Sequence, residues 1–158
     1  MLRPGLSYEV AATLPHGPGF VLLDRLIGYD EEAVVCEVTI RPQSRFCAPG
    51  GGVPAWVGVE YMAQAIGVHM GIRRLQRDLP VQVGLLLGAR LYDCTLPDFP
   101  VGAVLRVRAA ELMRDNDGVG VFACELHHQG ARIATADIKA FDPDDMDVFL
   151  RKLDERTP

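Results

Sequence analysis

One carboxyl group stands alone in the most apolar part of the chain. Glu60 is the only Asp, Glu, Lys or Arg between Phe46 and Ile72. A carboxyl in apolar surroundings is costly to ionise, so burial is expected to raise its pKa and suit it to general acid catalysis. Gln64 lies one helical turn later, where its amide could orient the carboxyl. The alternative is a structural Glu satisfied by a partner chain, and the residues alone leave both open.

Histidine is the side chain best suited to remove a proton near neutral pH. His16 lies in a segment rich in Pro and Gly, where it either does chemistry or positions substrate, or anchors the segment through hydrogen bonds. His69 follows Glu60 by nine residues, which places it on the opposite helix face and predicts a structural role. His127 and His128 flank a turn, and we expect them to be solvated.

The four cysteines indicate neither a metal site nor a redox motif. Cys36, Cys47, Cys94 and Cys124 form no C-x-x-C pair and lack the spacing to His of a zinc site. We interpret them as small core residues, and Cys47 has no neighbouring His to make it a nucleophile. From this cysteine pattern we expect no bound metal. Residues 1–19 contain no apolar core of a signal peptide, so we expect a cytoplasmic protein.

Length and charge limit the function classes further. A chain of 158 residues predicts a single domain over 1–158. The formal net charge of −5 argues against nucleic-acid binding, which needs clustered Lys and Arg. The longest apolar stretch, 53–72, contains Glu60, Gln64 and His69, so it predicts a core helix and not a membrane span.

The hydrophobic periodicity predicts short strands interrupted by one long helix. The expected strands are Phe20–Tyr29, Ala33–Ile40, Val83–Leu91, Ala103–Arg114, Val119–Leu126 and Ala131–Phe141. The expected helices are Ser7–Thr13, Ala55–Gln76 and a short amphipathic one around Val148–Lys152. We therefore expect a hairpin, a helix and then a meander of antiparallel strands.

The long helix decides the architecture. It is apolar on nearly every face as far as Ile72, which is typical of a helix buried all round. Small residues such as Gly58 and Gly67 would let other elements approach it closely. A sheet must curl around such a helix, which predicts the α+β hotdog fold. The exposed sheet edge is expected to pair with a second protomer.

Two motifs then resemble a known family. The segment Leu14-Pro15-His16, followed by Phe20-Val21-Leu22-Leu23-Asp24-Arg25-Leu26, resembles the opening of FabZ-type 3-hydroxyacyl-[acyl-carrier-protein] dehydratases. The segment Glu60-Tyr61-Met62-Ala63-Gln64-Ala65 resembles their E-x-M-A-Q helix motif. The resemblance spans roughly residues 14–141. The stretches GVPAWVGVEYMAQAIG and LLLGAR…CTLPDFPVG are more similar still to the ApeP-like dehydratase subunit of aryl-polyene biosynthesis clusters.

The resemblance implies a reaction and a site. A His removes a proton beside the thioester of a 3-hydroxyacyl chain on an acyl carrier protein, and a carboxyl protonates the departing hydroxyl. Glu60 matches the family carboxyl, and the amides of Val57, Gly58 and Val59 would polarise the thioester carbonyl. Gln64 and Phe46 are also expected to contact substrate. No metal or organic cofactor is implied.

The chain departs from the family in one respect. FabZ-type enzymes carry their catalytic His in a G-H-F-P segment before the helix, whereas the loop here reads Arg45-Phe46-Cys47-Ala48-Pro49-Gly50. His16 could replace it, or the partner in a heterodimer with a related hotdog subunit could donate the missing His. A homodimer is the other assembly that we consider. A hotdog thioesterase and a non-catalytic subunit of a dehydratase complex are the competing interpretations.

Three arginines end the long helix. Arg73, Arg74 and Arg77 complement the negative end of the helix dipole. They could also attract the acidic surface of a carrier protein. A solvated helix end is the equally simple interpretation.

Overall fold

A computed structural model describes residues 3–4 and 8–156. Its elements, in chain order, are β1 (Arg3–Pro4), α1 (Val10–Thr13), the 3-10 turn η2 (Pro18–Phe20), β2 (Arg25–Tyr29), β3 (Ala33–Thr39), β4 (Val53–Pro54), η3 (Ala55–Val57), α2 (Gly58–Leu75), β5 (Leu85–Cys94), β6 (Asp98–Phe99), β7 (Val104–Arg114), β8 (Val119–His128), β9 (Ala131–Phe141) and α3 (Met146–Asp154). The expected elements are present with shifted ends. The start of the first expected helix, at Ser7, lies outside the described residues.

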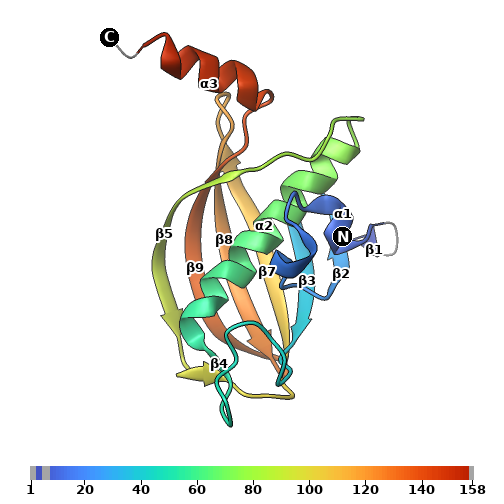
Figure 1. Cartoon of the computed structure of the whole chain (residues 1–158), viewed down its shortest axis with the longest axis vertical. Coiled ribbons are helices and arrows are strands. Elements are labelled where there is room, and N and C mark those ends of the chain that lie inside the picture. Colours follow the sequence, from blue (N-terminus) through green and yellow to red (C-terminus); the bar gives the residue numbers. More distant parts are fainter. Residues whose placement is uncertain (1–2, 5–7, 157–158) are drawn as a thin grey trace.

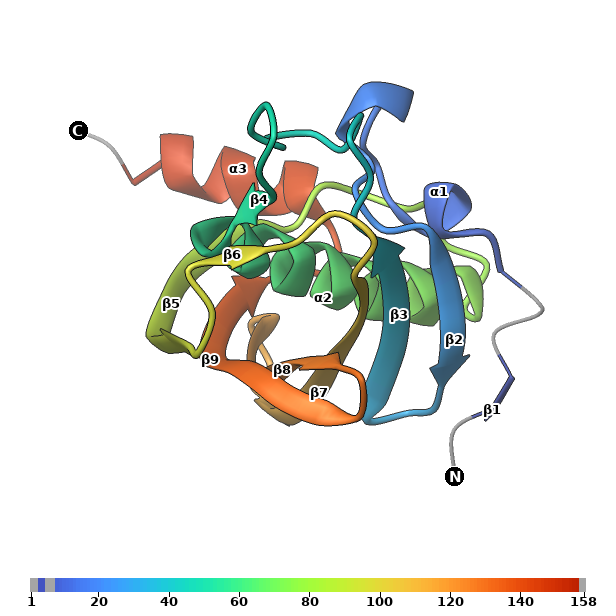
Figure 2. The ribbon, with the colours of Figure 1, turned by 90° about the horizontal axis from the view of Figure 1, so that it is seen from below.

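The long helix lies across one large antiparallel sheet. Seven strands pair in the order β1-β2-β3-β7-β8-β9-β5, and β4 and β6 form a separate small sheet. Figure 1 shows α2 running diagonally over this sheet, and Figure 2 shows the sheet curling around it. This is the expected α+β hotdog fold.

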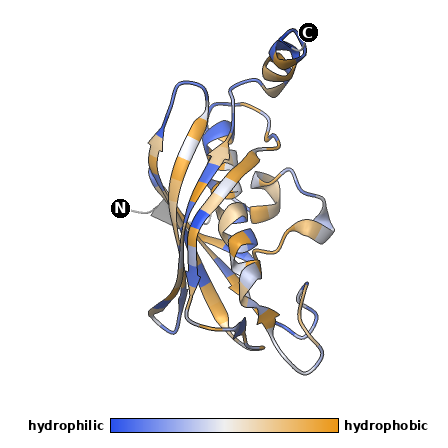
Figure 3. Ribbon diagram, turned by 90° about the vertical axis from the view of Figure 1, so that its left-hand side faces the viewer, coloured by the Kyte–Doolittle hydropathy of each residue, from blue (hydrophilic) through white to orange (hydrophobic). Residues whose placement is uncertain are grey.

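The core forms between α2 and the concave face of the sheet. Alternate side chains of β8 point inward, among them Phe122, Cys124 and Leu126, because successive residues of a strand face opposite sides. Met62 of α2 belongs to the same buried cluster. In Figure 3 the strands of the sheet and the helix beside them both carry many hydrophobic residues, coloured orange.

The position of β5 differs from the simple meander that we expected. The strands β7, β8 and β9 do follow one another, but β5 pairs with β9 at the edge of the sheet. The alternation of a strand predicts which face is buried, but it does not identify the neighbouring strand. Among the described residues, the outer edge of the apolar strand β5 therefore pairs with no other strand.

The N-terminal segment packs tightly on α2 through two glycines. A Cβ on Gly71 would lie 2.8 Å from the carbonyl carbon of Thr13, and a Cβ on Gly67 would lie 2.7 Å from Cδ2 of Leu14. The small residues of α2 therefore admit a neighbouring segment, as expected. This contact sets where the next residues, Pro15 and His16, lie along the helix.

We expect Gly71→Ala to destabilise the protein. Alanine in a helix gains about 1 kcal/mol over glycine. The new methyl group would collide with the backbone of Thr13, and overpacking of this kind costs about 1–3 kcal/mol. Denaturant unfolding should show a net loss of stability. In the matched variant Gly67→Ala the methyl group meets only the flexible end of Leu14, so stability should be equal or higher. Equal stability of both variants would contradict the packing described here.

No helix in the described residues is long and apolar enough to cross a membrane.

Candidate active site

Glu60 lies in the first turn of α2, on a narrow stripe of the helix that the sheet does not cover. The side chain of Glu60 is exposed, and Ala63 and Gly67, which follow on the same face, are half-buried. The expectation that α2 is buried all round is thus wrong along this stripe, because the sheet wraps the other faces only. In the described part of the single chain, the Glu60 carboxyl is therefore open to water.

Gln64 holds the carboxyl in place, as predicted. Its side chain is 2% exposed. Its Nε2 donates to Oε1 of Glu60 at 3.0 Å and to the carbonyl oxygen of Phe20 at 2.7 Å, while its Oε1 accepts from the amide of Leu22 at 2.8 Å. A carbonyl can only accept and an amide N–H can only donate, so the orientation of the Gln64 amide is fixed. One oxygen of Glu60 is therefore anchored, and the other remains available for chemistry.

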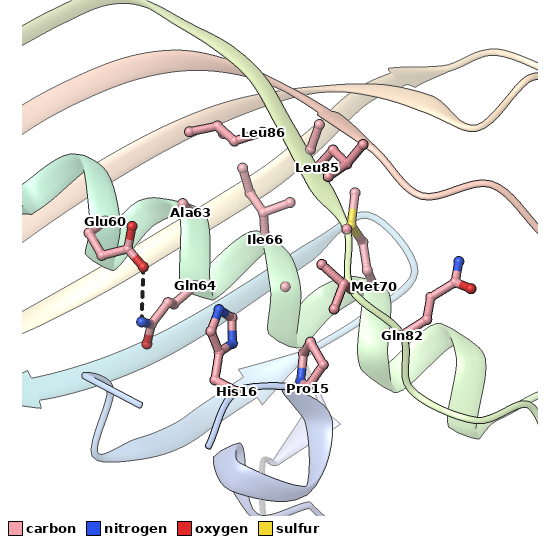
Figure 4. Close-up of a pocket in the computed structure, with 14 residues that line it drawn as sticks. Pro15, His16, Glu60, Ala63, Gln64, Ile66, Met70, Gln82, Leu85 and Leu86 are labelled. Carbon is pink, nitrogen blue, oxygen red and sulfur yellow. Dashed lines mark hydrogen bonds between the residues drawn. The ribbon is translucent and has the colours of Figure 1, made fainter. Parts of the chain in front are cut away.

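His16 approaches the same place from the N-terminal segment. It is exposed, and it lines the same cavity as Glu60 and Gln64. Figure 4 shows its imidazole beside Gln64 of α2. Within residues 8–156 no hydrogen bond joins His16 to Glu60. The fold thus brings the two predicted catalytic residues to one cavity without pairing them.

The cavity has a polar end, an apolar middle and a further polar side chain, Gln82, at its far end. Its volume is about 260 Å³. His16, Glu60 and Gln64 form the polar end (Figure 4). The rest of the wall includes the apolar side chains of Ile66, Met70, Val83, Leu85, Leu86 and Ala140. This arrangement suits a ligand with a reactive polar head and a hydrocarbon tail.

At the start of α2, not every backbone amide that was expected to polarise the thioester carbonyl is free to do so. The N–H of Gly58 already bonds to the carbonyl oxygen of Ala55, which also accepts the hydroxyl of Tyr92. A Cβ on Gly58 would collide with that hydroxyl. The structure therefore gives Gly58 a packing role, and its amide is not free to bind substrate. The roles of Val57 and Val59 stay predictions.

The loop before the helix lies outside this cavity. Phe46 does not line the cavity; its ring packs edge-to-face on exposed Trp56, with centroids 5.4 Å apart. Its φ is +66°, a left-handed conformation that a bulky residue rarely adopts. Cys47 is half-buried. Contact of Phe46 with a substrate would therefore need a site that the single chain does not form.

Comparison with known proteins identifies the family of the chain. The family model for the ApeP dehydratase matches residues 8–151. The chain belongs to the ApeP-like dehydratase family. A 3-hydroxyacyl-[acyl-carrier-protein] dehydratase FabZ of Chlamydia trachomatis is 31% identical over an alignment of 121 positions that covers 73% of this chain and 78% of that protein.

One solved structure agrees with this membership, and a second shares the fold. A chain of the dehydratase heterocomplex ApeI:P from Xenorhabdus doucetiae superposes on this ApeP-like protein with a TM-score of 0.82 and 32% identity, covering 90% of this chain and 96% of the other. The PaaI protein of E. coli, from the phenylacetic acid degradation operon, superposes with a TM-score of 0.58 and 16% identity, over 74% and 81% of the two chains. The second likeness concerns the fold alone.

The three arginines do not form a free positive surface in this ApeP-like protein. Arg73 bonds to Glu111 at 3.0 Å, and exposed Arg77 lies 3.3 Å from Asp144. Arg74 is buried, and its guanidinium donates to the carbonyl oxygen of Pro80 at 2.7 Å. These bonds give the arginines structural roles that the sequence did not indicate. Carrier-protein binding at this helix end remains a prediction without a free cationic cluster to support it.

The apolar wall of the cavity was missed in the sequence. Met70 lies ten residues after Glu60, and Ala63 and Ile66 follow the same helical spacing between them. That spacing was the available signal. Leu85 and Leu86 had none, because their place beside α2 depends on the long-range pairing of β5 with β9.

His69 has the structural role expected for it. It is 1% exposed, its Nε2 lies 3.2 Å from the carbonyl oxygen of Glu31, and its Nδ1 lies 3.9 Å from Glu111 with no hydrogen-bond partner in the described structure. Burial lowers the pKa of His69 below its usual value; the nearby Glu111 carboxylate opposes this, and Arg73 adds to it. The ring therefore stays neutral in the folded protein at pH values where an unfolded His takes up a proton.

We expect this difference to make stability fall in mild acid. Below a pH of about 6.5 the unfolded chain binds a proton that the folded His69 does not, so the free energy of unfolding should decrease as pH falls through this range. His69→Gln should remove part of this slope, measured by denaturant unfolding between neutral and acidic pH. The matched variant His16→Gln, at an exposed His, should keep it. Identical slopes for wild type and His69→Gln would contradict the assignment.

Proposed function

We propose that this chain is the carboxyl-bearing subunit of a 3-hydroxyacyl-[acyl-carrier-protein] dehydratase. The observation that carries the proposal is Glu60, held by Gln64 at the polar end of a cavity with an apolar wall. Membership of the ApeP-like dehydratase family and the similarity to FabZ support the same reaction class.

The chemistry requires one base and one acid. The base removes the proton from the carbon next to the thioester carbonyl, and the electron pair of that C–H bond forms the carbon–carbon double bond. The C–O bond to the 3-hydroxyl then breaks, and the Glu60 carboxyl gives its proton to the leaving oxygen, so that water departs. The product is a 2-enoyl thioester. The reaction needs no metal or organic cofactor.

The exposure of Glu60 suggests that a second subunit completes the site. A carboxyl open to water is a poor general acid at neutral pH, and a covering subunit would desolvate it. The solved ApeI:P assembly bears the name of a dehydratase heterocomplex, so at least one similar chain works with a different subunit. A partner of that kind could also supply the imidazole that the loop of this chain lacks. His16 is the alternative source of the base.

The β5 edge is the surface that we assign to this second subunit. Leu85, Leu86 and Leu87 are exposed on it, and Leu91 is 80% exposed. An apolar edge strand with free backbone groups is a liability unless another strand covers it. Pairing there would place the partner beside Leu85 and Leu86, which already line the Glu60 cavity.

We also propose that the protein recognises an acyl carrier protein and that it is located in the cytoplasm. A thioester on a carrier protein is the substrate of the FabZ relatives by their name.

Product analysis tests the proposed reaction. The chain, alone and mixed with a candidate partner, is incubated with a 3-hydroxyacyl thioester of an acyl carrier protein, and the products are identified by mass spectrometry. An enoyl thioester supports the dehydratase. Release of a free thiol would instead identify a thioesterase, and no conversion under any combination would contradict the proposed reaction.

A further inference from the structure

We infer that Met70 closes the far end of the Glu60 cavity and thereby limits the length of the acyl chain that the protein accepts. The inference rests on the proposed function, since it assigns the cavity to the tail of an acyl thioester. It adds a specificity-determining residue to the proposed reaction.

The cavity follows the α2 helix from Glu60 toward Met70. Figure 4 shows Glu60, Ala63, Ile66 and Met70 in a row along the helix, with Leu86 on the facing side. The ten residues from Glu60 to Met70 span about 15 Å, because an α-helix rises 1.5 Å per residue. A tail that starts at the carboxyl therefore runs the length of this row before it reaches Met70.

At the far end, Met70 packs against the chain that leads into β5. Met70 is 6% exposed. Its Sδ lies 3.5 Å from where a Cβ on Gly84 would be, and the carbonyl oxygen of Phe141 lies 3.4 Å from the same point. The thioether thus fills the gap between α2 and this segment. Removing it would lengthen the cavity.

Polar groups lie just beyond Met70. Gln82 borders the cavity there, and its Nε2 donates to Oδ1 of Asp142 at 2.7 Å and to the carbonyl oxygen of Pro143 at 2.6 Å. A hydrocarbon that passed Met70 would meet these satisfied polar groups and gain no apolar contact. Between Gln64 and Gln82 the wall offers no charged side chain.

A binding series on the full-length protein, alone and with its partner, tests the inference. The probes are acyl pantetheine amides from butyryl to tetradecanoyl, whose amide bond cannot be cleaved, and the measurement is isothermal titration calorimetry. For the wild type we expect affinity to rise by about four-fold for each methylene that is buried, and then to level off at one chain length. Met70→Ala should move that limit to longer chains, and the milder Met70→Val should move it by less.

The matched control is Met62→Ala. Met62 lies on the same helix and is 0% exposed, but it faces the core and does not line the cavity. Both truncations cost stability, so Met70→Val keeps the test available if the alanine variants unfold. We expect the limit of Met62→Ala to equal that of the wild type.

The outcomes separate this inference from the proposed reaction. An unchanged limit in the Met70 variants, an equal shift in Met62→Ala, or no binding of any amide would overturn the role of Met70, even if product analysis shows dehydration. A shifted limit in the Met70 variants supports the role of Met70 even if product analysis shows no enoyl thioester, and only the reaction assignment then fails.

Discussion

Glu60→Gln should lower the dehydration rate of the assembled enzyme by about 10²–10⁴-fold, the usual contribution of a positioned general acid. Glutamine has the shape of glutamate, and its amide oxygen can still accept the hydrogen bond from Gln64, so the site should stay in place. What the variant loses is a proton to give to the leaving hydroxyl. Steady-state kinetics should therefore show a large fall in kcat and little change in KM.

The control for this prediction is Glu155→Gln, which removes an exposed carboxylate outside the cavity. Its rate should equal that of the wild type. If Glu60→Gln also retains full activity in the assembled enzyme, the chain is a non-catalytic subunit and its partner carries the whole reaction.

The isolated chain should be a weak dehydratase, and a related hotdog subunit with a His in the loop before its central helix should raise the rate by about 10²–10⁴-fold. The reason is that the loop of this chain, around Phe46, has no imidazole, while the exposed Glu60 lacks a cover. Titrating one subunit into the other and measuring enoyl product should show saturation at a fixed ratio of the two chains.

His16→Gln tells the two sources of the base apart. If the partner provides the imidazole, the mixed enzyme should tolerate His16→Gln. Full activity of the wild-type chain alone, abolished by His16→Gln, would contradict the heteromeric site and identify His16 as the base.

The site was predictable from the sequence where the interactions are local. Glu60 and Gln64 are one helical turn apart, so the spacing alone predicted their contact, and the structure confirms it. The same holds for the hairpin of β2 and β3 and for the helix itself. Local periodicity determined these features.

Long-range pairing accounts for what the sequence missed. Arg73 bonds to Glu111, which lies 38 residues away, and no spacing rule links them. The edge position of β5 depends on β9, which follows it after two further strands of the same sheet. The exposure of Glu60 has the same origin, because a helical apolar pattern does not tell whether its own sheet or a second subunit covers each face.

The most direct test is an experimental structure of the assembled dimer. The account predicts that the partner covers the stripe of α2 through Glu60 and that the Glu60 carboxyl becomes buried. It also predicts an imidazole across the cavity, placed to reach the proton on carbon 2 of the acyl chain while the carboxyl reaches the 3-hydroxyl. A dimer in which Glu60 still points into open solvent, with no imidazole opposite, would contradict the proposed role of this residue.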